Sequence, residues 1–338
     1  GHKYTKDEAK KASGLEQVFW LDEFWTVLQS IIHYAENIYL NTNENDRSVY
    51  EVPYRDLRFI QQLKERYPLH QYERSALILR DLRPVKSEIE VQLTKKACEI
   101  TRDAFVRVLK FTKPGVTEYE IEAEIIHEFI RQRATGHAYN PIIASGPNAN
   151  ILHYNDNIQV CKAGDVILFD FGAEYANYNA DMSRSIPVSG RFSPRQKEVY
   201  NAVLRVMRAA TKLLVVGTIW NEYHDEVGRI MEAELIGLGL LDKQAVVKQN
   251  PAAPLYKKYF MHGTSHHLGL DTHDFGALKT PMTANMVFTV EPGIYIPDEK
   301  MGIRLEDDVV IQAEGPPLNL MQHIPIEVEE IETLMNSN

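Results

Sequence analysis

Two carboxylates near the middle of the chain lie where charged side chains are unusual. Asp170 ends the otherwise apolar run that begins at Val166, and Asp181 follows it beyond a stretch in which Gly172 and Asn177 indicate turns. A buried charge needs a partner, and two adjacent strands could bring these carboxylates together. Alone the pair is weak evidence, because an Asp at a strand end more often caps a turn than binds a metal.

A second pair of acids strengthens the interpretation. Glu291 closes the apolar run 286–290, and Glu306 follows the run 302–305. Four unpaired buried carboxylates would repel one another strongly, so either most of them are protonated or a concentrated positive charge lies among them. Two divalent ions would supply that charge, because they would nearly balance four carboxylates and one bridging hydroxide.

A histidine-rich segment lies between the two acid pairs. Residues 262–274 hold four of the twelve histidines of the chain, at positions 262, 266, 267 and 273. A lone histidine is more often hydrogen-bonded scaffolding than a ligand, and we expect His267 to pack or to face solvent. One imidazole among four carboxylates suits a harder ion such as Mn²⁺ better than a structural Zn²⁺. The sequence has no HExxH zinc helix.

Composition narrows the class of protein. The 338 residues carry a formal charge of −10, and 44% of them are hydrophobic and 25% charged. We expect a folded protein with a large core and a second, attached domain. The negative charge and the lack of a basic stripe disfavour a nucleic-acid partner. No apolar run approaches the roughly 20 residues that span a bilayer, so we expect no membrane partner.

The cysteines indicate the cellular location of the protein, and the first residues indicate how the sequence begins. Cys98 and Cys161 are the only cysteines, too few for a disulfide scaffold or a thiolate metal site. A reducing, cytoplasmic location therefore fits best. The chain opens abruptly at Gly1, which is typical of a segment cut from something longer.

The elements that must position the acids are indicated by caps and by apolar periodicity. Capping boxes at Ser87 with Glu90 and at Thr117 with Glu120 predict two helices, and similar signals predict helices from Ser193 to about 214 and over 220–235. Strands are predicted at 141–145, 166–172, 181–188, 286–290, 293–296 and 303–311.

Residues 87–190 and 193–312 therefore resemble two versions of one unit of helix, helix and sheet. Two such halves would form a cleft between them. Residues 1–85 mix amphipathic helix with short extended runs, such as Leu15 to Leu28 and Ser75 to Leu79, and we interpret them as an accessory domain. We interpret Arg83 to Ser87 as a linker, because Pro84 would end regular secondary structure there.

These segments resemble the pita-bread metallopeptidases, and within them the Xaa-Pro aminopeptidases (aminopeptidase P) and the related prolidases. The resemblance covers residues 87 to about 312 and includes the segments HGTSHHLGLDTHD, VEPGIYIP and GIRLEDD. It implies an α+β pita-bread (creatinase/aminopeptidase) fold with pseudo-twofold halves over 86–338. A partial N-terminal α/β accessory domain would occupy 1–85.

The resemblance also implies a role for individual residues. Two divalent metal ions, which we expect to be Mn²⁺, would be bound by Asp170, Asp181, His266, Glu291 and Glu306. Asp181 and Glu306 would bridge them, a bridging hydroxide would be the nucleophile, and Glu291 would shuttle protons. His153, His262 and His273 would hold the substrate and stabilise the tetrahedral intermediate, and His262, Tyr295 and Arg304 would lie near the proline pocket.

The implied activity is that of a Xaa-Pro aminopeptidase, which removes the first residue of a peptide whose second residue is proline. A prolidase restricted to Xaa-Pro dipeptides is the nearest alternative, and a noncatalytic binding protein on the same scaffold is another. The sequence departs from many relatives by placing His267 after the metal-binding histidine, and by its short accessory domain. We expect a homo-oligomer.

Overall fold

The computed structural model describes residues 1–42, 52–276 and 279–337. The chain divides into two compact units, Gly1–Leu79 and Arg80–Asn338. This division falls a few residues before the boundary predicted at 85/86, and the assignment of an accessory and a catalytic domain stays a prediction.

The first unit combines short helices with one two-stranded parallel sheet, in which β1 pairs with β2. Its elements are α1 (Lys6–Ser13), η1 (Leu21–Glu23), α2 (Phe24–Ile32), β1 (Asn37–Leu40), α3 (Arg55–Arg66), β2 (Gln71–Arg74) and α4 (Ala76–Leu82), which runs across the division.

The extended runs predicted in this unit are wrong in two places. Residues 24–28 belong to α2, and residues 76–79 belong to α4. In α4, Ala76 is buried and Leu79 half-buried, whereas Leu77 and Ile78 are exposed. Because the inward positions are three residues apart, this apolar run follows the period of a helix and not that of a strand.

The second unit begins with a helical pair followed by antiparallel strands. Its first half contains α5 (Glu88–Phe111), α6 (Glu118–Arg131), β3 (Gly136–His137), β4 (Ile142–Ser145), η2 (Gly146–Asn150), β5 (Val166–Asp170), β6 (Ala173–Tyr175), β7 (Tyr178–Asn179) and β8 (Ser183–Pro187). The predicted cap of α5 is confirmed, because Glu90 accepts the Ser87 N–H and hydroxyl, both at 2.7 Å.

The second half repeats this order. It contains α7 (Pro194–Leu213), α8 (Trp220–Gly237), α9 (Lys243–Val247), η3 (Leu255–Lys258), β9 (Val287–Val290), β10 (Gly293–Ile296), η4 (Pro297–Glu299), β11 (Met301–Arg304), β12 (Asp307–Val310), β13 (Leu318–Asn319) and α10 (Val328–Asn336).

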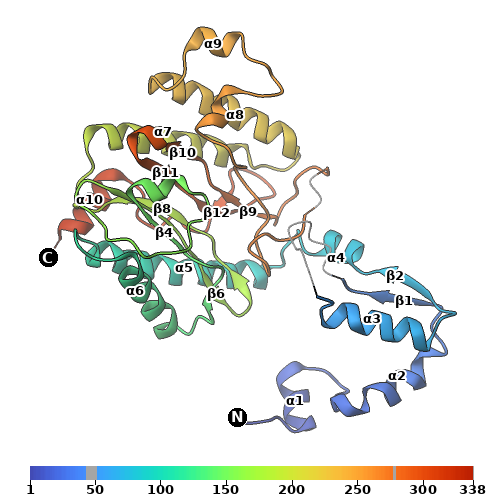
Figure 1. Cartoon of the computed structure of the whole chain (residues 1–338). Coiled ribbons are helices and arrows are strands. Elements are labelled where there is room, and N and C mark those ends of the chain that lie inside the picture. Colours follow the sequence, from blue (N-terminus) through green and yellow to red (C-terminus); the bar gives the residue numbers. More distant parts are fainter. Residues whose placement is uncertain (43–51, 277–278, 338) are drawn as a thin grey trace. The chain divides into compact units, whose positions relative to one another are not determined.

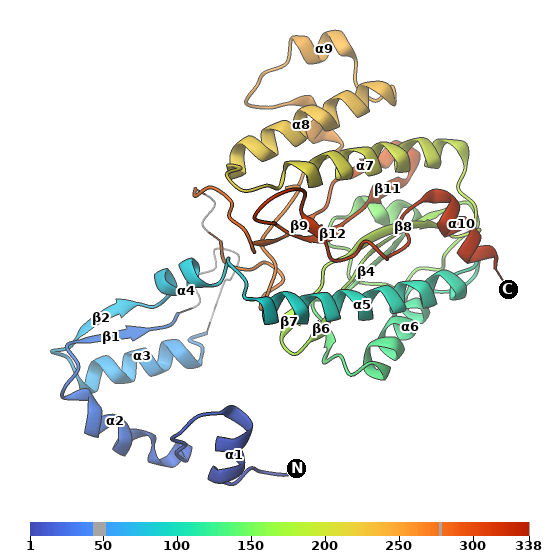
Figure 2. The same cartoon turned by 180° about the vertical axis from the view of Figure 1, so that it is seen from behind.

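The sheet topology gives the two halves a similar plan. One half has the three-stranded sheet β4-β5-β8, and the other has β13-β12-β9. In each half a hairpin is inserted between the two strands that flank the acids, β6-β7 in the first and β10-β11 in the second. Both views show the strands between α5 and α6 on one side and α7 and α8 on the other (Figure 1, Figure 2). The predicted pseudo-twofold, mixed architecture is confirmed.

One strand predicted from the sequence is divided into two strands in the structure. Residues 303–311 are divided between β11, which pairs with β10, and β12, which pairs with β9. The chain leaves one sheet at Arg304 and enters the other at Asp307, so Glu306 lies at the break and does not close a strand. A single apolar periodicity cannot reveal a change of partner strand.

A shared core holds the two halves together. Phe105 of α5, Phe169 of β5, Val203 of α7, Phe288 of β9 and Ile303 of β11 belong to one buried cluster. Both cysteines of the chain are free and buried. Among the described residues, no helix combines the length and the apolar character that crossing a membrane requires.

Candidate metal centre

Strands β5 and β8 position the first pair of acids. Asp170, the last residue of β5, is paired with Ser183, the first residue of β8, and Asp181 comes just before that strand. The chain segments approach closely because residue 172 is a glycine, at which a β-carbon would lie 1.7 Å from the carbonyl oxygen of Ala180. The two adjacent strands thus bring both carboxylates together.

A tyrosine that sequence reasoning missed joins this pair. The hydroxyl of Tyr139 lies 2.6 Å from Oδ1 of Asp170 and 2.5 Å from Oδ1 of Asp181. Tyr139 precedes β4, whose Ile142 pairs with Asp170. A hydroxyl has one proton, so the tyrosine donates to one carboxylate at a time and holds the two oxygens side by side.

The second pair occupies the equivalent place in the other half. Glu291 directly follows β9 and Glu306 directly precedes β12, and these strands pair with Val290 opposite Asp307. Ser183 connects the halves: its hydroxyl donates to Oε2 of Glu306 at 2.7 Å, and its carbonyl accepts the Glu306 N–H at 3.0 Å.

Neighbouring backbone aims His266 into the cluster. Its Nδ1 lies 3.0 Å from the carbonyl oxygen of His267 and therefore carries the proton that this carbonyl accepts. Its Nε2 lies 3.4 Å from Oδ2 of Asp181 and 3.7 Å from Oε1 of Glu291. The nitrogen that faces the carboxylates is thus the one available as a metal ligand.

Three side chains converge on one point. Asp181, His266 and Glu306 each offer an atom, and these atoms lie within 4.8 Å of one another. Glu291 lies beside His266, and Asp170 is joined to Asp181 by the Tyr139 hydroxyl, which contacts both carboxylates. The structure therefore gathers all five residues predicted as ligands into one cluster.

Burial and crowding shift the protonation of this cluster. Burial raises the pKa of Glu291 to about 7, against the opposing effect of His266. Burial also raises the pKa of Glu306 well above its usual value, with Asp181 and Glu291 adding to the shift. Burial alone would lower the pKa of His266, but the Asp181 and Glu291 carboxylates outweigh it and raise this pKa to about 9.

These observations fit divalent metal ions. Crowded carboxylates that hold protons above their usual pKa are groups from which a cation would displace protons. The donor set is rich in carboxylate oxygen and includes one imidazole, which suits ions such as Mn²⁺.

A hydrogen-bonded chain leads from the cluster to the residues predicted at the proline pocket. Nε2 of His262 lies 2.8 Å from the hydroxyl of Tyr295, which accepts from Nη1 of Arg304 at 2.9 Å. Nη2 of the same arginine donates to Oδ2 of Asp170 at 2.5 Å. Burial, with a contribution from Arg304, lowers the pKa of His262 to about 3. The ring is therefore neutral at pH 7 and accepts the Tyr295 proton.

The other predicted histidines occupy different surroundings. The ring of His273 is exposed and meets that of His266 edge-on, with ring centres 4.4 Å apart. His153 is exposed on the turn after η2. His267 is only 4% exposed and packs against Phe288 at 4.3 Å, so the packing role expected for it is confirmed and the solvent-facing one is wrong.

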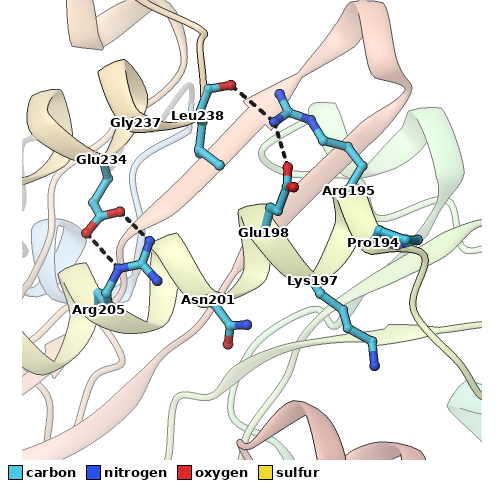
Figure 3. Close-up of a pocket in the computed structure, with 9 residues that line it drawn as sticks. All are labelled: Pro194, Arg195, Lys197, Glu198, Asn201, Arg205, Glu234, Gly237 and Leu238. Atoms are coloured by element: carbon cyan, nitrogen blue, oxygen red, sulfur yellow. Dashed lines mark hydrogen bonds and ion pairs between the residues drawn. The ribbon is translucent and has the colours of Figure 1, made fainter.

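A separate groove of about 520 Å³ lies between α7 and the end of α8 and shares no residue with the cluster (Figure 3). It is lined by Pro194, Arg195, Lys197, Glu198, Asn201, Arg205, Glu234, Gly237 and Leu238. Two of its arginines already have acidic partners: Arg205 lies 2.5 Å from Glu234, and Arg195 lies 3.3 Å from Glu198. Because these charged side chains are already paired with one another, the groove is poorly suited to acid–base chemistry.

The pseudo-twofold sheets and the cluster of carboxylates and histidine at their centre define a protein of the pita-bread class. The model of metallopeptidase family M24 matches residues 92–313, and the chain belongs to this family.

Relatives agree with this assignment. The chain is 38% identical to the Xaa-Pro aminopeptidase of Haemophilus influenzae over 273 residues, which are 77% of this chain and 62% of that protein. It is 40% identical to the Xaa-Pro aminopeptidase of Escherichia coli over 272 residues, 76% of this chain and 60% of that protein. The chain thus spans about three fifths of the length of these curated relatives. The structure of Pseudomonas aeruginosa aminopeptidase PepP superimposes with a TM-score of 0.86 and 34% identity, over 98% of this chain and 77% of that one.

Proposed function

We propose that this chain carries the catalytic site of a Xaa-Pro aminopeptidase, which hydrolyses the bond between the first residue of a peptide and a proline at the second position. The observation that carries the proposal is the convergence of Asp181, His266 and Glu306 within 4.8 Å. The names of the two curated relatives support the choice of substrate.

In this proposal two divalent ions, preferably Mn²⁺, would be held by Asp170, Asp181, His266, Glu291 and Glu306. Such ions supply Lewis acidity, which activates a water and polarises the carbonyl under attack. Asp170 accepts hydrogen bonds from Tyr139 and Arg304. Each of its carboxylate oxygens has a second lone pair, so Asp170 can still serve as a metal ligand.

The protein's own groups would move the protons. Glu291, whose Oε1 lies 3.7 Å from Nε2 of His266, is the carboxylate proposed to accept and return a proton, as a general acid–base group must. When the peptide bond breaks, the nitrogen of the proline must gain a proton to leave as an amine, and Glu291 is the proposed donor.

The histidines and the pocket residues would position the substrate. His153 and His273 would hydrogen-bond the substrate and stabilise the developing negative charge, and neutral His262 would line the proline pocket beside Tyr295. Tyr295 and Arg304 are linked to His262 and to Asp170 through one hydrogen-bonded chain. They would place the proline ring at a fixed distance from the reacting carbonyl.

Peptide products test the activity. The chelated protein should be inactive, and Mn²⁺ should restore cleavage of a Xaa-Pro-Yaa tripeptide to a free amino acid and Pro-Yaa better than Mg²⁺, which prefers oxygen ligands and retained water. The alanine counterpart and the N-acetylated tripeptide should be poor substrates. Equal cleavage of the alanine and proline peptides would end the proposal, and cleavage of the Xaa-Pro dipeptide alone would make the protein a prolidase.

A matched pair of variants tests the role of Glu291. Glu291→Gln keeps an oxygen for the metal but cannot exchange a proton, so kcat should fall by roughly 100-fold or more. Glu198→Gln changes a carboxylate of the separate groove, 62% exposed, and should leave kcat unchanged. Full activity of Glu291→Gln would remove it from the proposed proton path.

Location and assembly complete the proposal. A cytoplasmic setting suits the two free, buried cysteines, and a homo-oligomer is the expected state. Fractionation of source cells and light scattering of the purified protein would test these two points.

A further inference from the structure

A buried lysine lies behind the histidine segment of the cluster. The side chains of Lys86 and Asp274 are each 1% exposed, and Nζ of the lysine lies 2.9 Å from Oδ2 of the aspartate. The other oxygen of Asp274, Oδ1, lies 2.5 Å from Nη2 of Arg83, which is nearer the surface. Burial lowers the pKa of Lys86, and the Asp274 carboxylate opposes that shift. A buried charge is rarely retained without a close partner, so this pair joins two chain segments far apart in sequence.

The backbone around Lys86 is tied to the strand that leads to Glu291. Val85 forms an antiparallel bridge with Met286, and the N–H of Lys86 donates to the carbonyl of Asn285 at 2.9 Å. Lys86 was expected in a linker, but these contacts make it a fixed point next to the start of β9.

Asp274 in turn connects the lysine to the proposed metal ligand. Its N–H donates to the carbonyl oxygen of His267 at 2.9 Å, and the same oxygen accepts from Nδ1 of His266 at 3.0 Å. The carbonyl that sets the orientation of the His266 ring is therefore held by the residue that Lys86 anchors. His273, whose ring meets that of His266, directly precedes Asp274.

The fit of the lysine is tight. At Gly269 a β-carbon would lie 2.3 Å from Oδ2 of Asp274 and 2.8 Å from Cε of Lys86. The backbone of Gly269 therefore closes over the ion pair, and its carbonyl accepts the N–H of Asn179 at 3.0 Å. The segment 267–274 is therefore packed closely around the ion pair.

We propose that Lys86 is a positioning residue, whose buried ion pair with Asp274 holds the His267 carbonyl and thereby orients His266 and His273 at the metal centre. The inference deepens the proposed function and rests on it, since it takes His266 as a metal ligand. It predicts that loss of the pair weakens metal binding as well as stability.

Three variants test the proposal, with MnCl2 as the titrant in calorimetry and with melting temperatures of the metal-free proteins. In Lys86→Met the Mn²⁺ dissociation constant should rise about tenfold or more, as for other partners behind a ligand. At saturating Mn²⁺ its kcat should fall more than its KM rises, because His266 and His273 would both shift while the proposed proline pocket is untouched. Lys197→Met removes a lysine paired with Glu332 at 2.9 Å between α7 and α10 and should leave the dissociation constant unchanged.

The double variant Lys86→Met with Asp274→Leu separates positioning from stability. Replacing a buried ion pair by apolar side chains is often neutral for stability, and Arg83 would keep Asp271 at 2.7 Å as its acidic partner. The melting temperature of the double variant should therefore approach that of the unchanged protein while Mn²⁺ binding stays weakened. This variant also carries the test if Lys86→Met fails to fold. Unchanged Mn²⁺ affinity in the double variant would overturn the inference alone, whereas an unchanged protein that binds no Mn²⁺ would overturn the proposed function and the inference with it.

Discussion

The affinity of the protein for Mn²⁺ should depend strongly on pH, because the metal must displace protons from the cluster. The perturbation is a change of pH from 6 to 8 during a Mn²⁺ titration. His266 has a pKa of about 9 in the metal-free protein, so at pH 7 it holds a proton that a metal ligand cannot keep.

The structure supplies the size of the effect. A pH of 7 lies two units below the pKa of His266, and each unit corresponds to about 1.36 kcal/mol of free energy. Removing the proton from His266 therefore costs about 3 kcal/mol, or a factor of about 100 in affinity relative to a fully deprotonated ring. Glu291, with a pKa of about 7, adds to the dependence below neutral pH. Affinity should rise about tenfold per pH unit above pH 7, and more steeply below it.

Calorimetry can measure both the affinity and the protons. Titrations at one pH in two buffers with different ionisation enthalpies should show release of about one proton or more at pH 7. The buffers must bind Mn²⁺ weakly, and a titration without protein is the control. An affinity that is constant from pH 6 to 8, with equal heats in both buffers, would refute the proton-displacement reasoning.

Three further predictions concern stability and the loops around the cluster. In the metal-free protein, the raised pKa of His266, from 6.5 to about 9, stabilises the fold by about 3 kcal/mol below pH 6.5, and this contribution is lost as the pH rises through 9. Urea unfolding at pH 6.5 and 9 measures this contribution, and a flat profile would contradict it. Glu118 is fully buried and accepts from Ser145 N–H and hydroxyl, Tyr154 hydroxyl and Gln159 N–H at 2.6–2.9 Å. In Glu118→Gln some of these donors would face an amide NH2 group, so the free energy of unfolding should fall by about 2 kcal/mol. The same unfolding assay measures this loss, and unaltered stability would disprove it. His267→Ala should lower stability by about 2 kcal/mol through the cavity it opens but keep the metal content, and loss of metal from this variant by elemental analysis would show that the ligand within the histidine segment is misassigned.

Local signals in the sequence determined the main elements and the candidate ligands. The helix starts at Ser87 and Thr117 follow from capping residues three positions apart, and the structure places Glu90 and Glu120 as those caps. The acids stood out because charge in an apolar run is visible without any knowledge of the fold. These features depend on residues that are neighbours along the chain.

Strand pairing decided what the sequence left open. Tyr139 contacts Asp181 across 42 positions, Ser183 contacts Glu306 across 123, and Lys86 contacts Asp274 across 188. An alternating pattern predicts that a strand exists but does not fix which strand lies beside it or in which register.

The sequence by itself therefore determined which residues could form a metal centre, and it indicated two equivalent halves to carry them. Only the tertiary structure decided which groups hold those residues in place, how Glu306 comes to lie between two sheets, and that His266 presents Nε2 to the carboxylates. The physical reason is that ligand type is a property of a side chain, whereas its orientation and pKa depend on partners that the folded chain brings into contact.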